Sequence, residues 1–195
     1  MAQIKTRIGM PLDEWMRRYD EEGAFELIDG EVIPVHPPKF GHSNLSNTLA
    51  FRINSLTLPK KLGEAFVETA FVLPDNAESD WVKGSCIPDV MFVTTQRLAD
   101  YKAQTPDWAD RPLAIVPDLA VEIISANDHY TDVNRKVAGY LKDGVKLVWV
   151  FDPKQKTVAI YSAGSKISTT LSENDTLSGG ELIPGLELSI KELFN

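Results

Sequence analysis

A single carboxylate interrupts an apolar stretch of strand length, and a lysine follows on the next expected element. The stretch Leu119 to Ile124 is rich in β-branched residues, a pattern that predicts a strand buried on both faces. Glu122 lies inside it, and a buried carboxylate is unfavourable unless a cation, a metal ion or hydrogen-bond donors surround it. Lys136 is the candidate cation, because its long stem can extend along apolar surface. Glu122 and Lys136 are therefore the first pair to explain.

The residues after Glu122 predict a helix and a second strand. Apolar residues recur there with helical spacing, at Val133, Val137 and Leu141. Gly144 follows as a C-terminal stop, and residues 147–151 are again apolar and β-branched. Strand, helix and strand in this order predict a βαβ crossover whose strands are parallel or share one sheet. Lys136 and Tyr140 lie one turn apart on that helix, just off its apolar stripe.

Composition indicates an ordinary globular protein of one domain. The chain has 195 residues, of which 43% are hydrophobic and 25% charged. It has no apolar run of bilayer length and no signal-peptide pattern, so no membrane partner is expected. The single Cys86 cannot form an internal disulfide, which favours a reducing cytoplasm. The net charge of −8 lacks the basic footprint of most nucleic-acid binders, so any polyanion contact must be local.

The expected organisation is a single domain over residues 1–195 with three parts. These are an N-terminal helix and hairpin (10–35), a core (41–152), and a C-terminal hairpin and docking segment (153–195). The core order is helix 41–58, strand 64–73, strand 87–94, strand 118–124, helix 130–143 and strand 147–151. Residues 75–85 are expected to be a polar loop that carries Trp81, and Asp118 to be a residue at a strand start.

The clearest hairpin signal surrounds Asp29-Gly30, within residues 25–35. A two-residue turn pairs Ile28 with Glu31, and Glu26 with Ile33. Both acids then project from the same face of the hairpin. Two acids in this position usually form the solvent-facing side of a sheet, and a role in a site is the less favoured reading.

The order of elements, with Pro88-Asp89 on the second core strand and Glu122 on the third, resembles the PD-(D/E)XK nuclease superfamily. Within it, the sequences FELIDGE, PDVMFV, PDLAVEIIS, GVKLVWVFDP and LIPGLEL are similar to the Uma-type family of restriction endonucleases. The resemblance runs from about residue 25 to the C-terminus. It implies an α/β fold, a restriction-endonuclease-like mixed sheet flanked by helices, here with an added N-terminal β-hairpin.

The resemblance also implies site residues. Asp89 matches the motif aspartate and Glu122 the second acid, while Ile124 stands where the standard motif has lysine. The Uma-type pattern takes its lysine from the following helix, where Lys136 stands, with Tyr140 as a supporting residue. The first helix of the core, residues 41–58, carries no acid, so Glu26 or Glu31 is a possible substitute. His42, at the start of that helix, is a further supporting candidate, although a capping role is the simpler reading.

The chemistry implied by these residues is metal-dependent hydrolysis of a phosphodiester. Such a reaction needs a divalent ion, an activated water and a cation for developing charge. Asp89 and Glu122, on adjacent strands, are expected to hold Mg²⁺ or Mn²⁺ with the Ile123 carbonyl and waters, and Lys136 to orient the water or stabilise charge. An ion cluster of Asp89, Lys136 and Glu122 without a catalytic role is the alternative, and spacing alone does not separate the two.

Three functions follow from these readings. The first is a Mg²⁺-dependent endonuclease acting on DNA; the second is a non-catalytic nucleic-acid or protein-binding module on the same fold. The third is a hydrolase of a smaller phosphodiester, which the acidic surface would suit better than long duplex. A duplex cutter must reach two strands, which a two-fold homodimer does most simply. Trp81 and Trp108 are candidate interface anchors, and packing of each over its own core is an equally good interpretation.

Overall fold

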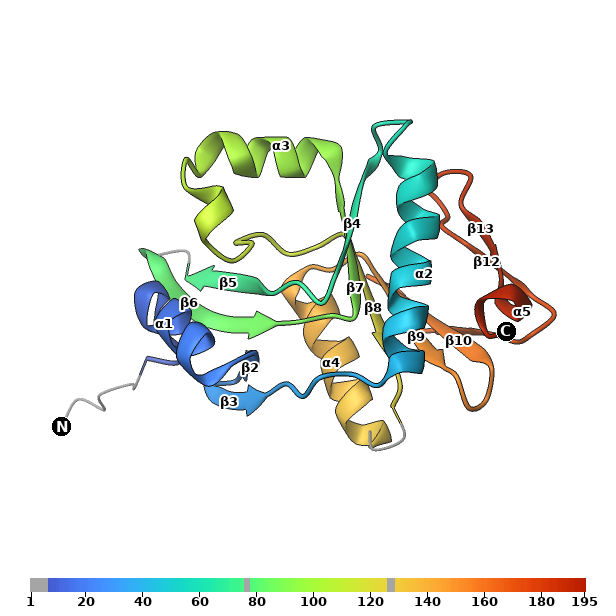
Figure 1. Ribbon diagram of the computed structural model, residues 1–195, viewed down its shortest axis with the longest axis horizontal. Coiled ribbons are helices and arrows are strands. Elements are labelled where there is room, and N and C mark those ends of the chain that lie inside the picture. Colours follow the sequence, from blue (N-terminus) through green and yellow to red (C-terminus); the bar gives the residue numbers. More distant parts are fainter. Residues whose placement is uncertain (1–6, 76–77, 126–128) are drawn as a thin grey trace. The chain divides into compact units, whose positions relative to one another are not determined.

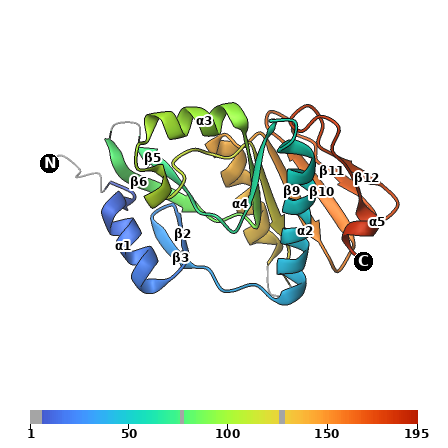
Figure 2. The same ribbon diagram turned by 45° about the horizontal axis from the view of Figure 1, so that its top comes forward.

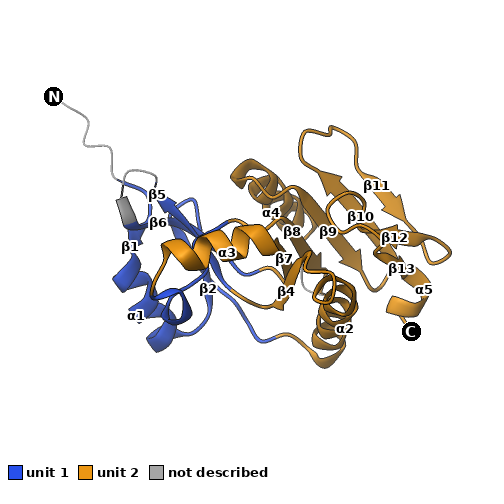
Figure 3. Ribbon diagram, turned by 90° about the horizontal axis from the view of Figure 1, so that it is seen from above, with its two compact units in different colours: residues 1–37, 70–87, 107–115 blue, residues 38–69, 88–106, 116–195 orange. Residues whose placement is uncertain are grey.

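The computed structural model describes residues 7–75, 78–125 and 129–195, which form two compact units. Unit 1 comprises residues 1–37, 70–87 and 107–115, and unit 2 comprises residues 38–69, 88–106 and 116–195 (Figure 3). The single domain expected over residues 1–195 stays a prediction.

Unit 1 is an antiparallel sheet with one helix. Its elements are β1 (Met10–Pro11), α1 (Leu12–Glu22), β2 (Phe25–Ile28), β3 (Glu31–Pro34), β5 (Phe71–Asp75), β6 (Glu78–Cys86) and the 3₁₀ turn η1 (Trp108–Asp110). The strands follow the order β1-β6-β2-β3, and β5 also pairs with β6. The amphipathic helix α1 buries Leu12 and Trp15 in an apolar core with Phe25 and Leu27 of β2.

The hairpin of unit 1 has the register expected from its sequence. Ile28 pairs with Glu31 and Glu26 with Ile33, around a two-residue turn in which both residues have positive φ. The expectation that both acids face solvent is wrong for Glu26. Its side chain is buried and accepts a hydrogen bond of 3.0 Å from the Ile87 amide, whereas Glu31 is exposed. Ile87, which directly follows β6, thus supplies a donor of the kind that a buried carboxylate requires.

Unit 2 contains a six-stranded sheet with the order β11-β10-β9-β8-β7-β4. Its strands are β4 (Gly63–Val67), β7 (Val90–Thr94), β8 (Leu119–Ile123), β9 (Leu147–Asp152), β10 (Thr157–Ser162) and β11 (Thr169–Leu171). A separate pair, β12 (Thr176–Ser178) and β13 (Glu187–Ser189), lies near the C-terminus. The helices are α2 (Phe40–Thr57), α3 (Thr95–Gln104), α4 (Tyr130–Asp143) and α5 (Ile190–Leu193).

The sheet of unit 2 is mixed, as expected. Strands β8 and β9 are parallel and joined by α4, which confirms the βαβ crossover, and the other pairs of this sheet are antiparallel. Helix α4 spans the predicted residues 130–143 and ends at Gly144, whose φ of +107° suits glycine. Helices on both sides of the sheet, visible in Figures 1 and 2, complete the α/β arrangement.

The two faces of β8 contact different helices, because side chains alternate along a strand. Val121 and Ile123 pack in the main apolar core with Leu49 and Ile53 of α2. Glu122, between them in sequence, contacts α4 instead. One helix of unit 2 therefore packs on each face of β8.

Two expectations about residues 64–85 are wrong. The predicted strand 64–73 is two strands, β4 and β5, which belong to different sheets and different units. The chain turns between them at Glu68, whose φ is +45°. The predicted polar loop 75–85 contains β6, which pairs with β1, β2 and β5. Trp81 on β6 donates a hydrogen bond of 2.9 Å from Nε1 to the Ile8 carbonyl, so it packs within its own unit.

The described residues contain no helix that combines the length and the apolar character needed to cross a membrane.

Candidate active site

Asp89 and Glu122 lie side by side at one end of the strand pair β7 and β8. These strands are antiparallel, and Val90 pairs with Val121. Asp89 directly precedes β7, and its side chain accepts a hydrogen bond from the amide of Ile123, the residue after Glu122. The sequence places Pro88 directly before this position, which fixes the backbone where β7 begins. Two carboxylates from distant parts of the chain thus meet at one point.

Glu122 is held by two side chains of α4. The Lys136 ammonium lies 3.0 Å from Glu122 Oε2, and the Tyr140 hydroxyl donates a hydrogen bond of 2.5 Å to Oε1. Lys136 and Tyr140 are one helical turn apart, so both can reach the same carboxylate. The Tyr140 ring is buried, whereas Lys136 is partly exposed. The cation and donor that a buried acid requires are both present, as the sequence predicts.

Asp89 is held by the neighbouring strand and by α2. Its Oδ2 accepts a hydrogen bond of 2.5 Å from the Ile123 amide, and its Oδ1 lies 2.8 Å from His42 Nε2. The side chains of His42 and Asp89 are 16% and 17% exposed, so the pair is largely shielded from water. The ring N–H is not directed straight at the oxygen, which makes this contact an ion pair more than an aligned hydrogen bond.

The acids around His42 favour its charged form. Asp89 raises the pKa of His42 above its ordinary value, and this effect outweighs burial, which lowers it. Glu68 and Glu122 raise the pKa of His42 further through their charges. His42 and Lys136 therefore supply positive charge from α2 and α4 respectively to two adjacent carboxylates.

The structure joins most of the residues singled out in the sequence. Asp89, Glu122, Lys136, Tyr140 and His42 all belong to unit 2 and are linked by the contacts above. Glu26 and Glu31, the possible substitutes for a missing acid, belong to unit 1 instead.

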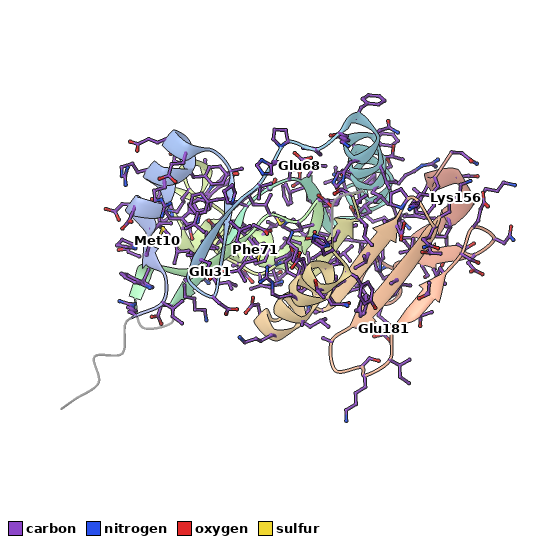
Figure 4. All side chains as sticks on the ribbon, turned by 90° about the horizontal axis from the view of Figure 1, so that it is seen from below. Met10, Glu31, Glu68, Phe71, Lys156 and Glu181 are labelled. Atoms are coloured by element: carbon purple, nitrogen blue, oxygen red, sulfur yellow. The ribbon has the colours of Figure 1, made fainter. Side chains whose placement is uncertain are left out.

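Glu68 is a neighbour of the site that the sequence did not indicate. Its amide donates a hydrogen bond of 3.2 Å to the Asp89 carbonyl, and its carboxylate acts on the pKa of His42. Glu68, labelled in Figure 4, adopts the positive φ that ends β4. A non-glycine residue in that conformation is uncommon, and such residues concentrate near functional sites. In sequence it is hidden inside an apolar stretch that predicts an unbroken strand.

The donor set at this point fits a hard divalent cation. Asp89 and Glu122 present carboxylate oxygens, and Mg²⁺ takes one or two carboxylates and keeps several waters. Among the described residues, no group of three or more His, Cys, Asp and Glu side chains is arranged to hold a metal. A Mg²⁺ or Mn²⁺ ion would therefore rely on these two acids, with the Ile123 carbonyl and waters as further ligands.

A second cluster of charges lies at the opposite end of β8. Asp118 is fully buried, and its Oδ1 lies 2.8 Å from the Lys146 ammonium and 3.0 Å from the Arg97 guanidinium. Its Oδ2 accepts a hydrogen bond of 3.0 Å from the Thr94 amide. These partners come from the ends of β7 and β9 and from α3, so Asp118 ties together the strand ends rather than contributing to the site.

Comparisons with known proteins identify a family and a similar fold. Residues 12–191 match the model of the Uma2 family, described as "Putative restriction endonuclease". The fold is similar to the crystal structure of a protein from Anabaena variabilis ATCC 29413, described as "a putative nuclease belonging to DUF820". The two share 26% sequence identity with a TM-score of 0.75, over 95% of this chain and 97% of the other. A search of curated proteins found no match. Because the family match covers nearly the whole chain, this protein belongs to the Uma2 family.

Proposed function

We propose that this protein hydrolyses phosphodiester bonds of DNA with the help of Mg²⁺ or Mn²⁺. The observation that carries the proposal is the meeting of Asp89 and Glu122 at the strand ends, with the Lys136 ammonium 3.0 Å from Glu122. Membership of the Uma2 family and the nuclease-like fold support the same reaction class.

In the proposed reaction, Asp89 and Glu122 hold the metal ion, which when bound neutralises phosphate charge and makes water more acidic. Lys136 lies beside Glu122, where its ammonium can donate a hydrogen bond to the attacking water or to a phosphate oxygen. Tyr140 fixes one oxygen of Glu122, so that the carboxylate keeps one orientation. His42 places a second positive charge beside Asp89 and so favours a bound anion.

A specific observation favours one alternative, a non-catalytic binding module. Each carboxylate oxygen of Asp89 and Glu122 already contacts a donor or cation of the chain itself. A closed cluster of this kind satisfies buried acids without a metal. Under this alternative the protein keeps the fold and binds a partner without cleaving it.

Metal binding separates the two candidates. In the proposed enzyme, Mn²⁺ raises the melting temperature, because an ion that binds only the native state stabilises it. Glu122→Gln removes this increase, while Glu181→Gln, at an exposed position in the same unit, keeps it. A wild-type protein that folds well but melts at the same temperature with and without Mn²⁺ would support the closed cluster.

Cleavage assays test the roles of the α4 residues. Lys136→Met should abolish Mg²⁺-dependent cleavage of a labelled DNA duplex or single strand. Lys142→Met, on an exposed position of the same helix, should leave it unchanged. Tyr140→Phe keeps the buried ring but loses its hydrogen bond to Glu122, so about a tenfold to hundredfold loss of rate is expected. Full activity of Lys136→Met would contradict the assignment.

A further inference from the structure

The outward face of α2 carries a continuous stripe without charge. Its exposed positions recur with helical spacing, at Phe40, Asn44, Asn47, Phe51, Ser55 and the following Leu58. The large apolar members are strongly exposed: Phe40 by 87%, Phe51 by 69% and Leu58 by 51%. Because α2 has 18 residues, the stripe is about 27 Å long. We define these six residues as the α2 stripe.

Such a surface is unusual for a helix that faces water, because solvent-facing helix positions are normally polar or charged. In α1, every exposed position carries a charge: Asp13, Glu14, Arg17, Asp20, Glu21 and Glu22. On α2 the one charged exposed residue is Arg52, which lies beside the stripe and 3.8 Å from Glu192. The charge at the edge of the stripe is thus matched within the chain.

We propose that the α2 stripe is the interface of a homodimer, in which it packs against the same stripe of a second copy. Two copies with a net charge of −8 repel each other, and a face without charge is where they can approach most easily. A two-fold interface brings the same patch of both subunits together, so an uncharged patch meets an uncharged patch. A charged partner protein would instead select an oppositely charged face.

The positions of the large residues suit an antiparallel pair of α2 helices. If the two-fold axis crosses the exposed face of α2 at the level of residue 49, Phe40 lies beside Leu58 of the second copy. Phe51 then lies beside Asn47 of the second copy. Antiparallel packing also aligns the two helix dipoles favourably. Each bulky apolar residue therefore meets a side chain on the second copy.

The area is sufficient for a specific contact. An aromatic side chain presents roughly 150–250 Å² of surface, so the stripe contributes on the order of 500 Å² per copy. The pair then buries on the order of 1,000 Å², the size at which specific interfaces begin. The apolar centre and the neutral amide and hydroxyl groups around it match the usual composition of such interfaces.

The proposed dimer does not require nuclease activity, and its contact differs from the one expected from the sequence. The anchors predicted from sequence, Trp81 and Trp108, both belong to unit 1, and Trp81 is engaged with its own chain. The α2 stripe belongs to unit 2.

Light scattering after size-exclusion chromatography tests the interface with the full chain. The wild type should be a dimer at about 100 μM and dissociate on dilution. Phe51→Glu should weaken dimerisation at least about a hundredfold, because the changed residue occurs twice in a two-fold interface. Ala99→Glu is the matched control: it adds the same charge at an exposed position of α3 and should leave the dimer intact.

Melting curves of each variant confirm that it is folded, and Phe40→Glu provides a second test at the end of the stripe. A wild type that stays monomeric at every concentration would overturn the proposal and leave the stripe to a different protein. A dimer that survives both Phe51→Glu and Phe40→Glu would overturn it as well, because the contact would then lie elsewhere. Metal binding and cleavage are measured independently of the oligomeric state, so failure of the interface and failure of the proposed reaction can be told apart.

Discussion

Replacement of Asp118 by asparagine tests the charge cluster at the far end of β8. Asparagine keeps the shape and an oxygen for the Thr94 amide, but changes a charge-assisted hydrogen bond into a neutral one, a loss of about 1 kcal/mol. The ion pairs to Arg97 and Lys146 are also lost. Since these cations are 35% and 60% exposed, water screens them, and together they contribute about 1–2 kcal/mol. Asp118→Asn should therefore lower the free energy of unfolding by about 2–3 kcal/mol at neutral pH.

The effect has a defined pH dependence. Burial alone raises the pKa of Asp118, but Lys146, the Thr94 amide and Arg97 outweigh it and hold this pKa below its ordinary value. A group whose pKa is lower in the folded state stabilises the fold fully above its unfolded pKa. That contribution is lost as the pH falls through the folded pKa. The difference between wild type and Asp118→Asn should be constant above about pH 5 and shrink below about pH 4.

Urea denaturation followed by circular dichroism at a series of pH values measures both quantities. The control is Glu173→Gln, which removes a solvent-exposed ion pair with Lys156 in the same unit and should produce no measurable change. Equal stability of Asp118→Asn and wild type at neutral pH would refute the estimate. A difference of the same size at pH 3 as at pH 7 would show that asparagine disturbs packing rather than charge.

Two further predictions concern the site and unit 1. The double change Ile124→Lys, Lys136→Met should restore part of the cleavage that Lys136→Met abolishes, because the strand then places an ammonium beside the same carboxylate. Cleavage is measured on the same labelled DNA. No rescue in a double variant as stable as the wild type would contradict this geometry. Ser85→Ala removes the hydroxyl that accepts hydrogen bonds of 3.0 Å from both the Trp15 indole and the Leu27 amide. Two buried donors then lack a partner, so thermal or urea unfolding should show a loss of about 2–4 kcal/mol; a loss below about 1 kcal/mol would mean that water replaces the hydroxyl.

The crossover could be predicted from sequence because each of its signals is local. The helical spacing of Val133, Val137 and Leu141 and the stop at Gly144 predict α4 to the residue. The contact between Glu122 and Lys136 follows from the same elements, since a buried acid in the first strand requires a cation and the crossover helix offers one.

The parts of the fold and of the site that the sequence did not predict depend on contacts between distant segments. Residues 64–73 are mostly apolar and contain no glycine or proline, so no strong local signal marks the turn at Glu68. The pairing of β4 and β5 with different strands requires this turn. The polar sequence of β6 hides a strand that is stabilised by three neighbours. The role of His42 could not be recognised from local spacing, because its partner Asp89 lies far along the chain. Asp118 has the sequence of a strand start, and its burial depends on Arg97 and Lys146.

Glu122 of β8 and Asp118, which directly precedes this strand, also restrict how β8 can pair during folding. Side chains alternate along a strand, so a shift of β8 by one residue exchanges its two faces. Glu122 would then enter the apolar layer beneath α2, and Ile123 would leave it. Asp118 would separate from Lys146 and Arg97 in the same movement. A one-residue shift would therefore separate both acids from their cations at once, so the charge clusters at the two ends of β8 disfavour that alignment.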